Sequence, residues 1–124
     1  MSDTKKRVLI VEDDLVLADV LANKLKLEGY DAQTVPDGQA AINLLAKEKF
    51  DLMLLDLMMP WFDGFHVLEE LKTWKDFKTP IIIMSNLAGL DDINRAKSLG
   101  VIDYLVKTST TPELIIKEIK KHLK

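Results

Sequence analysis

The sequence predicts an α/β protein in which a parallel sheet of five strands is covered by helices on both faces. Two observations support this prediction. Short apolar runs alternate along the chain with longer segments of helical period, and strands joined through helices run parallel. The apolar runs also lack the polar alternation of a half-exposed strand, as expected when both faces of the sheet are buried.

The first half of the chain contains three of the expected strands. Residues 7–11 (RVLIV) and 51–55 (DLMLL) are short and apolar, which indicates buried positions in the sheet. Residues 31–35 (DAQTV) are more polar, so we place this strand at an edge.

Two helices are expected between these strands. Residues 15–28 carry leucines at helical spacing, and Gly29 follows them as a left-handed cap. Asp14 precedes this helix and is expected to cap its first turn. The turn at residues 36–38 (PDG) leads into the second helix, whose apolar residues are Ala41, Leu44 and Leu45.

The second half continues the alternation. Helices are expected over residues 65–74 and 90–99, and strands over residues 81–84 (IIIM) and 102–106 (IDYLV). The last helix is expected to begin at Thr110, because Thr110 and Glu113 have the spacing of a capping box and Pro112 falls in the first turn.

The composition predicts one cytoplasmic domain over residues 1–124, with no output domain within them. Hydrophobic residues make up 48% and charged residues 30% of the chain, as in globular proteins. A net charge of -3 argues against direct nucleic-acid binding. No apolar run approaches the roughly 18 residues of a membrane span. The lack of cysteine excludes disulfides, thiolate metal sites and cysteine nucleophiles.

Chemically active side chains follow four of the expected strands. Ligands of open α/β sheets bind at the carboxyl ends of the strands. Each residue alone has an ordinary explanation as a helix cap, a turn residue or a surface charge. Their meeting at one edge of the sheet favours a functional site, which contains Glu12, Asp13, Asp14, Asp56, Ser85 and Lys107.

The carboxylates at this edge require a cation. Asp56 lies in an apolar run, and crowded carboxylates there raise at least one pKa unless positive charge intervenes. Lys107 supplies one such charge. Oxygen ligands without histidine or cysteine favour Mg²⁺ over zinc as a second cation.

Four blocks of the chain closely resemble the receiver domain of two-component response regulators: VLIVEDD (8–14), DLMMPWFDG (56–64), IIIMS (81–85) and DYLVK (103–107). The resemblance covers essentially the whole chain. It implies a flavodoxin-like (βα)5 fold with strand order 2-1-3-4-5, as in the chemotaxis regulators.

The resemblance also assigns roles to the residues of the site. Asp56 resembles the phosphoacceptor, which takes a phosphoryl group from a histidine kinase or phosphotransfer protein. Mg²⁺ would be held by Asp13, Asp56, the backbone carbonyl of Met58 and, through water, Glu12.

Three further residues resemble those that sense the phosphoryl group. The resemblance implies that Lys107 pairs with the phosphoryl group, that the Ser85 hydroxyl moves to bind it, and that Tyr104 turns inward as Ser85 moves. The face of the fourth helix, fifth strand and last helix would then bind a downstream protein or a missing output domain. The domain would be a monomer or a phosphorylation-linked dimer, and not a turnover enzyme.

Two departures from the family pattern carry expectations of their own. Thr108 follows Lys107 where a cis proline is usual, so we expect a trans bond or a strained loop and a less firmly held Lys107. Met58 and Leu87 lie two residues beyond Asp56 and Ser85. Neither can orient a water molecule, so we expect the acyl phosphate to hydrolyse slowly.

The sequence is also compatible with other functions to different degrees. A phosphatase of the haloacid-dehalogenase type would need a second aspartate where Met58 stands, and an FMN binder would need a hydroxyl-rich first loop. A receiver-like interaction module that is not phosphorylated remains open. Trp61 and Phe62 could contact a partner or pack locally, and His66 and His122 are expected at the surface.

Overall fold

The computed structural model describes residues 5–124. The first four residues of the expected domain lie outside this part. Within it, the strands form one parallel sheet of order β2-β1-β3-β4-β5, which confirms the predicted order and the edge position of β2. The strands are β1 (Arg7–Val11), β2 (Asp31–Val35), β3 (Leu52–Leu55), β4 (Ile81–Ser85) and β5 (Asp103–Val106).

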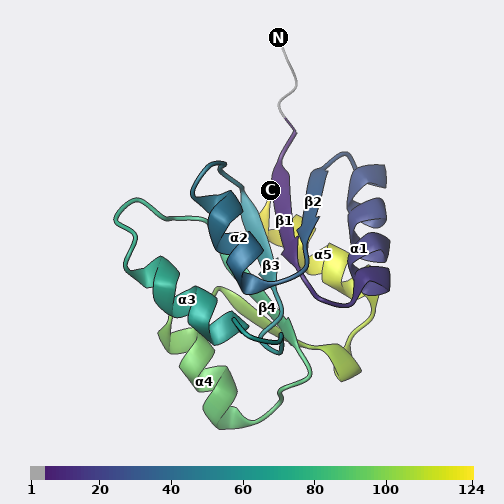
Figure 1. Ribbon diagram of the computed structural model, residues 1–124. Helices are drawn as coiled ribbons and strands as arrows, with labels where there is room; N and C mark the ends of the chain where they lie inside the picture. Colours follow the sequence, from purple (N-terminus) through teal and green to yellow (C-terminus); the bar gives the residue numbers. More distant parts are fainter. Residues whose placement is uncertain (1–4) are drawn as a thin grey trace.

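Helices cover both faces of the sheet, as predicted. Figure 1 shows α1 and α5 on one side of the sheet and α2, α3 and α4 on the other. The helices are α1 (Leu15–Leu27), α2 (Gly38–Leu45), α3 (Gly64–Lys72), α4 (Leu90–Ser98) and α5 (Pro112–His122). The expected boundaries coincide with the observed ones or differ from them by one or two residues, which is the usual uncertainty of helix and strand ends.

The core consists of two apolar layers, one on each side of the sheet. Along β3, Leu52 and Leu54 pack with the helices α1 and α5, whereas Met53 and Leu55 pack with α2, α3 and α4. Successive side chains of a strand point to opposite faces, so a run of four apolar residues supplies both layers. This explains why β3 shows no polar alternation.

The caps of α1 and α4 confirm the predictions. Asp14 Oδ1 accepts hydrogen bonds from the N–H groups of Val16 and Leu17, both at 3.1 Å. Gly29 and Gly100 have φ values of +93° and +95°, a conformation that glycine adopts without steric cost.

The predicted capping box of the last helix is wrong. The N-cap is Thr111, whose hydroxyl accepts a hydrogen bond from Leu114 N (3.2 Å), and α5 begins at Pro112. A residue before proline is forced into an extended conformation, and Thr111 has φ -127° and ψ 161°. Thr110 therefore lies one residue too early, after a 3-10 turn over Lys107–Ser109.

None of the helices in residues 5–124 combines the length and the apolar character that crossing a membrane requires.

Candidate functional site

The predicted site residues meet at the carboxyl edge of the sheet. Backbone hydrogen bonds extend the strand ladders one residue further: Asp56 N donates to Val11 O (3.0 Å) and Glu12 N donates to Val35 O (3.1 Å). Glu12 and Asp56 are therefore fixed side by side at the ends of two paired strands. Ser85 ends β4, and Lys107 directly follows β5.

Lys107 lies between two buried carboxylates. Its Nζ is 2.6 Å from Glu12 Oε1 and 3.1 Å from Asp56 Oδ2. Glu12 is 1% exposed and Asp56 2% exposed. One ammonium group is thus paired with two carboxylates. It cannot neutralise both of them, so the cluster keeps a net negative charge when both acids are ionised.

Burial and charge alter the acid–base behaviour of this cluster. Burial, with repulsion from Asp56, raises the pKa of Glu12 to about 7, although Lys107 and the N–H of Asp14 oppose the rise. Burial alone would lower the pKa of Lys107, but its contacts with Glu12 and Asp56 outweigh this and raise it. The lysine is therefore held as a cation.

Each buried carboxylate has one oxygen fixed by the backbone and one facing Lys107. Asp56 Oδ1 accepts a hydrogen bond from Met58 N (3.0 Å), and Glu12 Oε2 accepts one from Asp14 N (2.9 Å). The short contact between Lys107 and Glu12 Oε1 lacks the geometry of a hydrogen bond, so this buried oxygen has an ion-pair partner only.

The acidic side chains are close enough to share one cation. Glu12, Asp13 and Asp56 each bring an oxygen to within 4.8 Å of the others. Asp13 is exposed to solvent, so an ion from solution can reach the group. Three carboxylates at these mutual distances form a donor set that suits a hard divalent cation.

Ser85 and Tyr104 are connected through the backbone of Leu87. The buried Ser85 Oγ accepts a hydrogen bond from Leu87 N (3.2 Å), and the Tyr104 hydroxyl donates one to Leu87 O (2.6 Å). Burial of this partly enclosed tyrosine raises the pKa of its hydroxyl. Sequence reasoning considered only the side chain of Leu87 and missed this backbone link, for which the sequence holds no signal.

The loop between β3 and α3 is closely packed. A Cβ atom on Gly64 would lie 2.6 Å from Asp56 O and from Leu57 Cα, and one on Gly38 would lie 2.3 Å from Phe62 O. Gly38 was predicted only as a turn residue. Because it has no Cβ atom, the loop that follows Asp56 can pack directly against its backbone. Phe62 packs against the core, whereas Trp61 is 99% exposed.

The peptide bond between Lys107 and Thr108 is trans, since no cis bond occurs in residues 5–124. This confirms the trans bond expected for a residue other than proline at position 108. Lys107 is nonetheless paired with both buried carboxylates. The predicted weaker positioning of Lys107 does not show in these contacts.

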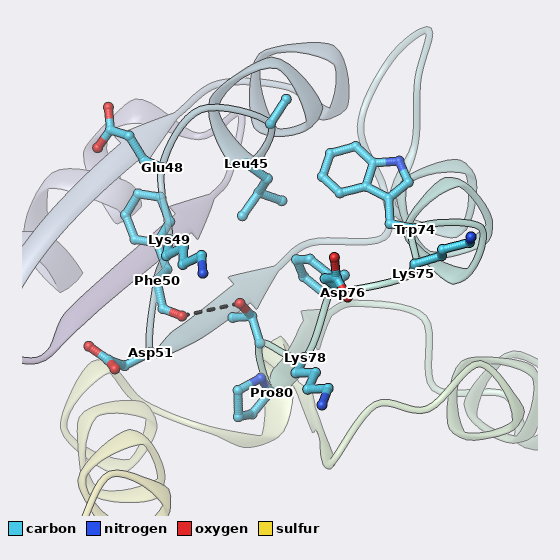
Figure 2. Close-up of a pocket in the computed structure, with 13 residues that line it drawn as sticks. Leu45, Glu48, Lys49, Phe50, Asp51, Trp74, Lys75, Asp76, Lys78 and Pro80 are labelled. Carbon is cyan, nitrogen blue, oxygen red and sulfur yellow. Dashed lines mark hydrogen bonds between the residues drawn. The ribbon is translucent and has the colours of Figure 1, made fainter.

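A groove of about 820 Å³ lies at the opposite edge of the sheet from Asp56. It is lined by the segments that precede β3 and β4, several of whose side chains are drawn in Figure 2. Thr79 Oγ1 donates a hydrogen bond to Phe50 O (3.1 Å) and so joins the two segments. Aromatic side chains and scattered charges line it, among them Phe50, Trp74, Lys75, Asp76 and Phe77. None of the predicted site residues contributes to it.

The two histidines lie outside the site. His66 is well exposed, with Nδ1 3.1 Å from Asp63 Oδ1. His122 is also a surface residue, as predicted, although only 26% of its side chain is exposed, and its Nε2 lies 3.6 Å from Asp103 Oδ2. Glu118 joins His122 and Asp103 in a small cluster between the start of β5 and the end of α5.

Fold and site together define a doubly wound α/β protein with an acidic, lysine-neutralised site at the carboxyl edge of its sheet. The chain matches the family described as "Response regulator receiver domain" over residues 8–120. It therefore belongs to the receiver-domain family of response regulators.

Curated relatives are longer than this chain. The "Probable transcriptional regulator ycf27" of Guillardia theta is 38% identical over 112 residues, covering 90% of this chain and 43% of the relative. The "Heme response regulator HssR" of Staphylococcus aureus (strain Newman) is 37% identical over 109 residues, covering 88% of this chain and 48% of the relative. The chain thus spans less than half the length of these relatives.

Solved structures agree with this assignment. The chemotaxis protein CheY4 of Vibrio cholerae has a TM-score of 0.86 at 26% identity, covering 95% of this chain and 98% of that one. The receiver domain of a putative Luxo repressor protein from Vibrio parahaemolyticus has a TM-score of 0.88 at 30% identity, covering 97% and 91%. Both are similar to this chain over nearly their whole length.

Proposed function

We propose that this receiver domain accepts a phosphoryl group on Asp56 from the phosphohistidine of a histidine kinase or phosphotransfer protein. One observation carries the proposal. In a chain of this family, Lys107 bridges the buried carboxylates of Asp56 and Glu12 at the carboxyl edge of the sheet. These are the groups that phosphoryl transfer to a carboxylate needs.

The transfer forms a bond between an Asp56 oxygen and phosphorus while the bond from phosphorus to the histidine nitrogen breaks. Charge spreads over the equatorial oxygens during this step, so catalysis consists mainly of positioning and charge neutralisation. Met58 N–H holds the Asp56 carboxylate in place, and the Lys107 ammonium faces its other oxygen.

We assign a Mg²⁺ site to Asp13, Asp56, the backbone carbonyl of Met58 and, through water, Glu12. When bound, Mg²⁺ supplies further positive charge for the phosphoryl oxygens. The mutual distances of the carboxylates and the exposure of Asp13 to solvent support this assignment.

The phosphoryl group would act through Ser85 and Tyr104. If the Ser85 hydroxyl turns to a phosphoryl oxygen, it gives up its hydrogen bond from Leu87 N, and Leu87 also holds the Tyr104 hydroxyl. A movement of the Ser85 hydroxyl would thereby alter the backbone position of Leu87 and, with it, the hydrogen bond of Tyr104 on β5. The face formed by α4, β5 and α5 would change its affinity for a downstream partner.

The output of this switch would belong to another domain or another protein. Relatives about twice as long as this chain carry names of transcriptional and heme response regulators. We propose that the receiver works in the cytoplasm as a switch and not as a turnover enzyme. It would act as a monomer or as a phosphorylation-linked dimer.

Intact-mass measurement after incubation with acetyl phosphate and Mg²⁺ tests the proposal. We expect the wild type to gain one phosphoryl group. Asp56→Asn should gain none, whereas Asp76→Asn, at the far edge of the sheet, should react like the wild type. A wild type that gains no phosphoryl group would instead support an interaction module that is not phosphorylated.

A further inference from the structure

Trp61 has a backbone conformation that the residue type does not favour. Its φ is +69°, and among residues 5–124 it is the one residue other than glycine with a positive φ. Phe62 N donates a hydrogen bond to Pro60 O (2.8 Å), so Trp61 is the central residue of a γ-turn. The γ-turn with positive φ is rare and strained, and a bulky residue in it is an outlier.

The side chain of Trp61 does not compensate for this strain. It is 99% exposed, so the largest side chain of the loop buries nothing against its own domain. The adjacent Phe62 behaves in the opposite way, since it packs against the core and beside His66. A glycine at position 61 would relieve the backbone strain without loss of packing.

The loop that carries Trp61 is held firmly at both sides of the turn. Gly64 N donates to Leu57 O (3.1 Å), which closes the loop. Gly64 and Gly38 allow close contacts that a Cβ atom would prevent, with Asp56 and Leu57 in one case and Phe62 in the other. The surroundings therefore impose the strained turn and fix the backbone position from which the indole projects into solvent.

Trp61 lies on the rim of the phosphorylation site. It is three residues from Gly64, which contacts the backbone of Asp56 and Leu57, so its Cα lies within roughly 11 Å of that point. Met58, in the same loop, is 51% exposed. Two apolar side chains thus stand beside a phosphoacceptor that is itself buried.

We propose that Trp61 is an anchor residue for the protein that donates the phosphoryl group. This inference rests on the proposed function. The donor must bring its phosphohistidine to within about 3.5 Å of a buried Asp56, so its surface has to cover the rim. Tryptophan is among the side chains that are enriched at the energetic centre of such contacts, and Trp61 is fully available for one. The partner would offer an apolar hollow beside its phosphohistidine.

The test compares two phosphoryl donors on Trp61→Gly. Acetyl phosphate is too small to need a docking surface. The protein donor is the histidine kinase of the source genome that transfers fastest to the wild type. We expect an unchanged rate with acetyl phosphate and a fall of about tenfold or more in kcat/KM with the kinase. Trp61→Asn, which also tolerates positive φ, should behave alike, and Trp61→Phe should retain part of the transfer.

A matched control is Leu27→Ala, which removes an 88% exposed leucine at the far end of α1 and should affect neither donor. Trp61→Gly should also raise the midpoint of urea unfolding, because the strain is relieved. The inference is overturned if kinase transfer to Trp61→Gly and Trp61→Asn equals that to the wild type. It is also overturned if both donors slow equally, or if acetyl phosphate labels the wild type but no kinase does. A wild type that acetyl phosphate cannot label refutes the proposed function itself.

Discussion

At the residue scale, Lys107 links the two buried carboxylates of the site, Glu12 and Asp56. It is the only cation within hydrogen-bond distance of both Glu12 and Asp56 in the part of the chain that the structure describes. Its position after β5 was predictable from the sequence, because parallel strands end at one edge. Which carboxylates it contacts was not, because that depends on side-chain geometry at the end of the sheet.

Removal of this cation should slow phosphorylation. We expect Lys107→Ala to reduce the rate with acetyl phosphate and Mg²⁺ by about 100-fold, since a preorganised charge next to the reacting oxygens is lost. Intact mass against time measures the rate, and circular dichroism verifies the fold. Lys78→Ala, beside the groove of Figure 2, should react normally. Wild-type kinetics for Lys107→Ala would show that the lysine plays no part in the transfer.

The burial of Glu12 leads to a pH dependence of Mg²⁺ binding. Its pKa of about 7 lies above the usual value, so below pH 7 the folded, metal-free protein holds a proton that Mg²⁺ must displace. The dissociation constant should therefore rise about tenfold per pH unit as the pH falls below 7. Isothermal titration calorimetry measures this slope, and Glu12→Gln should abolish it. A constant affinity between about pH 5.5 and 7 would contradict the assigned protonation.

Met58 and Leu87 should govern the lifetime of the acyl phosphate. Neither side chain can orient a water molecule for attack, so we expect slow hydrolysis. Met58→Asn combined with Leu87→Glu should accelerate the loss of phosphate by about tenfold or more. Intact mass after removal of the donor gives the rate, with Leu27→Glu as a surface control. Equal lifetimes for the double variant and the wild type would eliminate this explanation.

At the element scale, the start of α5 is the boundary at which the sequence pattern predicted the wrong N-cap residue. The spacing of Thr110 and Glu113 fits a capping box, but Pro112 dictates the cap because it forces Thr111 to be extended. Glu113 instead pairs with Lys24 of α1 at 2.9 Å. The strands were easier to predict, because a buried parallel strand needs only a short apolar run.

The cap assignment has a direct consequence for stability. Thr111→Ala should lower the free energy of unfolding by about 1 kcal/mol, because Leu114 N loses its hydrogen-bond acceptor. Thr110→Ala, the matched control, should have a much smaller effect. Urea unfolding followed by circular dichroism compares the two variants. A larger loss of unfolding free energy for Thr110→Ala than for Thr111→Ala would contradict the cap at Thr111 and support the predicted capping box at Thr110.

The loop between β3 and α3 could not be predicted at this scale. Its composition gives no sign that Trp61 would take a positive φ or that Phe62 would turn into the core. Both follow from contacts with Gly38 and Gly64. Gly38 in particular lies far away in the sequence and acts through tertiary packing.

At the scale of the whole molecule, the residues that stabilise the doubly wound fold and the residues that form the site lie in different parts of the sheet. Alternate residues of the central strands form two apolar layers, while the ends of the same strands place Glu12, Asp56, Ser85 and Lys107 at one edge. The sequence predicted this arrangement because it depends only on the order and direction of the strands. The contacts within the site depend on exact side-chain positions and required the structure.

Chemical mapping of the modified residue shows whether Asp56 carries the phosphoryl group. The wild type is incubated with acetyl phosphate and Mg²⁺, the acyl phosphate is reduced with borohydride, and the peptides are sequenced by mass spectrometry. Reduction converts a phosphorylated aspartate into homoserine. We expect homoserine at position 56 alone. Homoserine at Asp13 or another aspartate, or none at all, would contradict it.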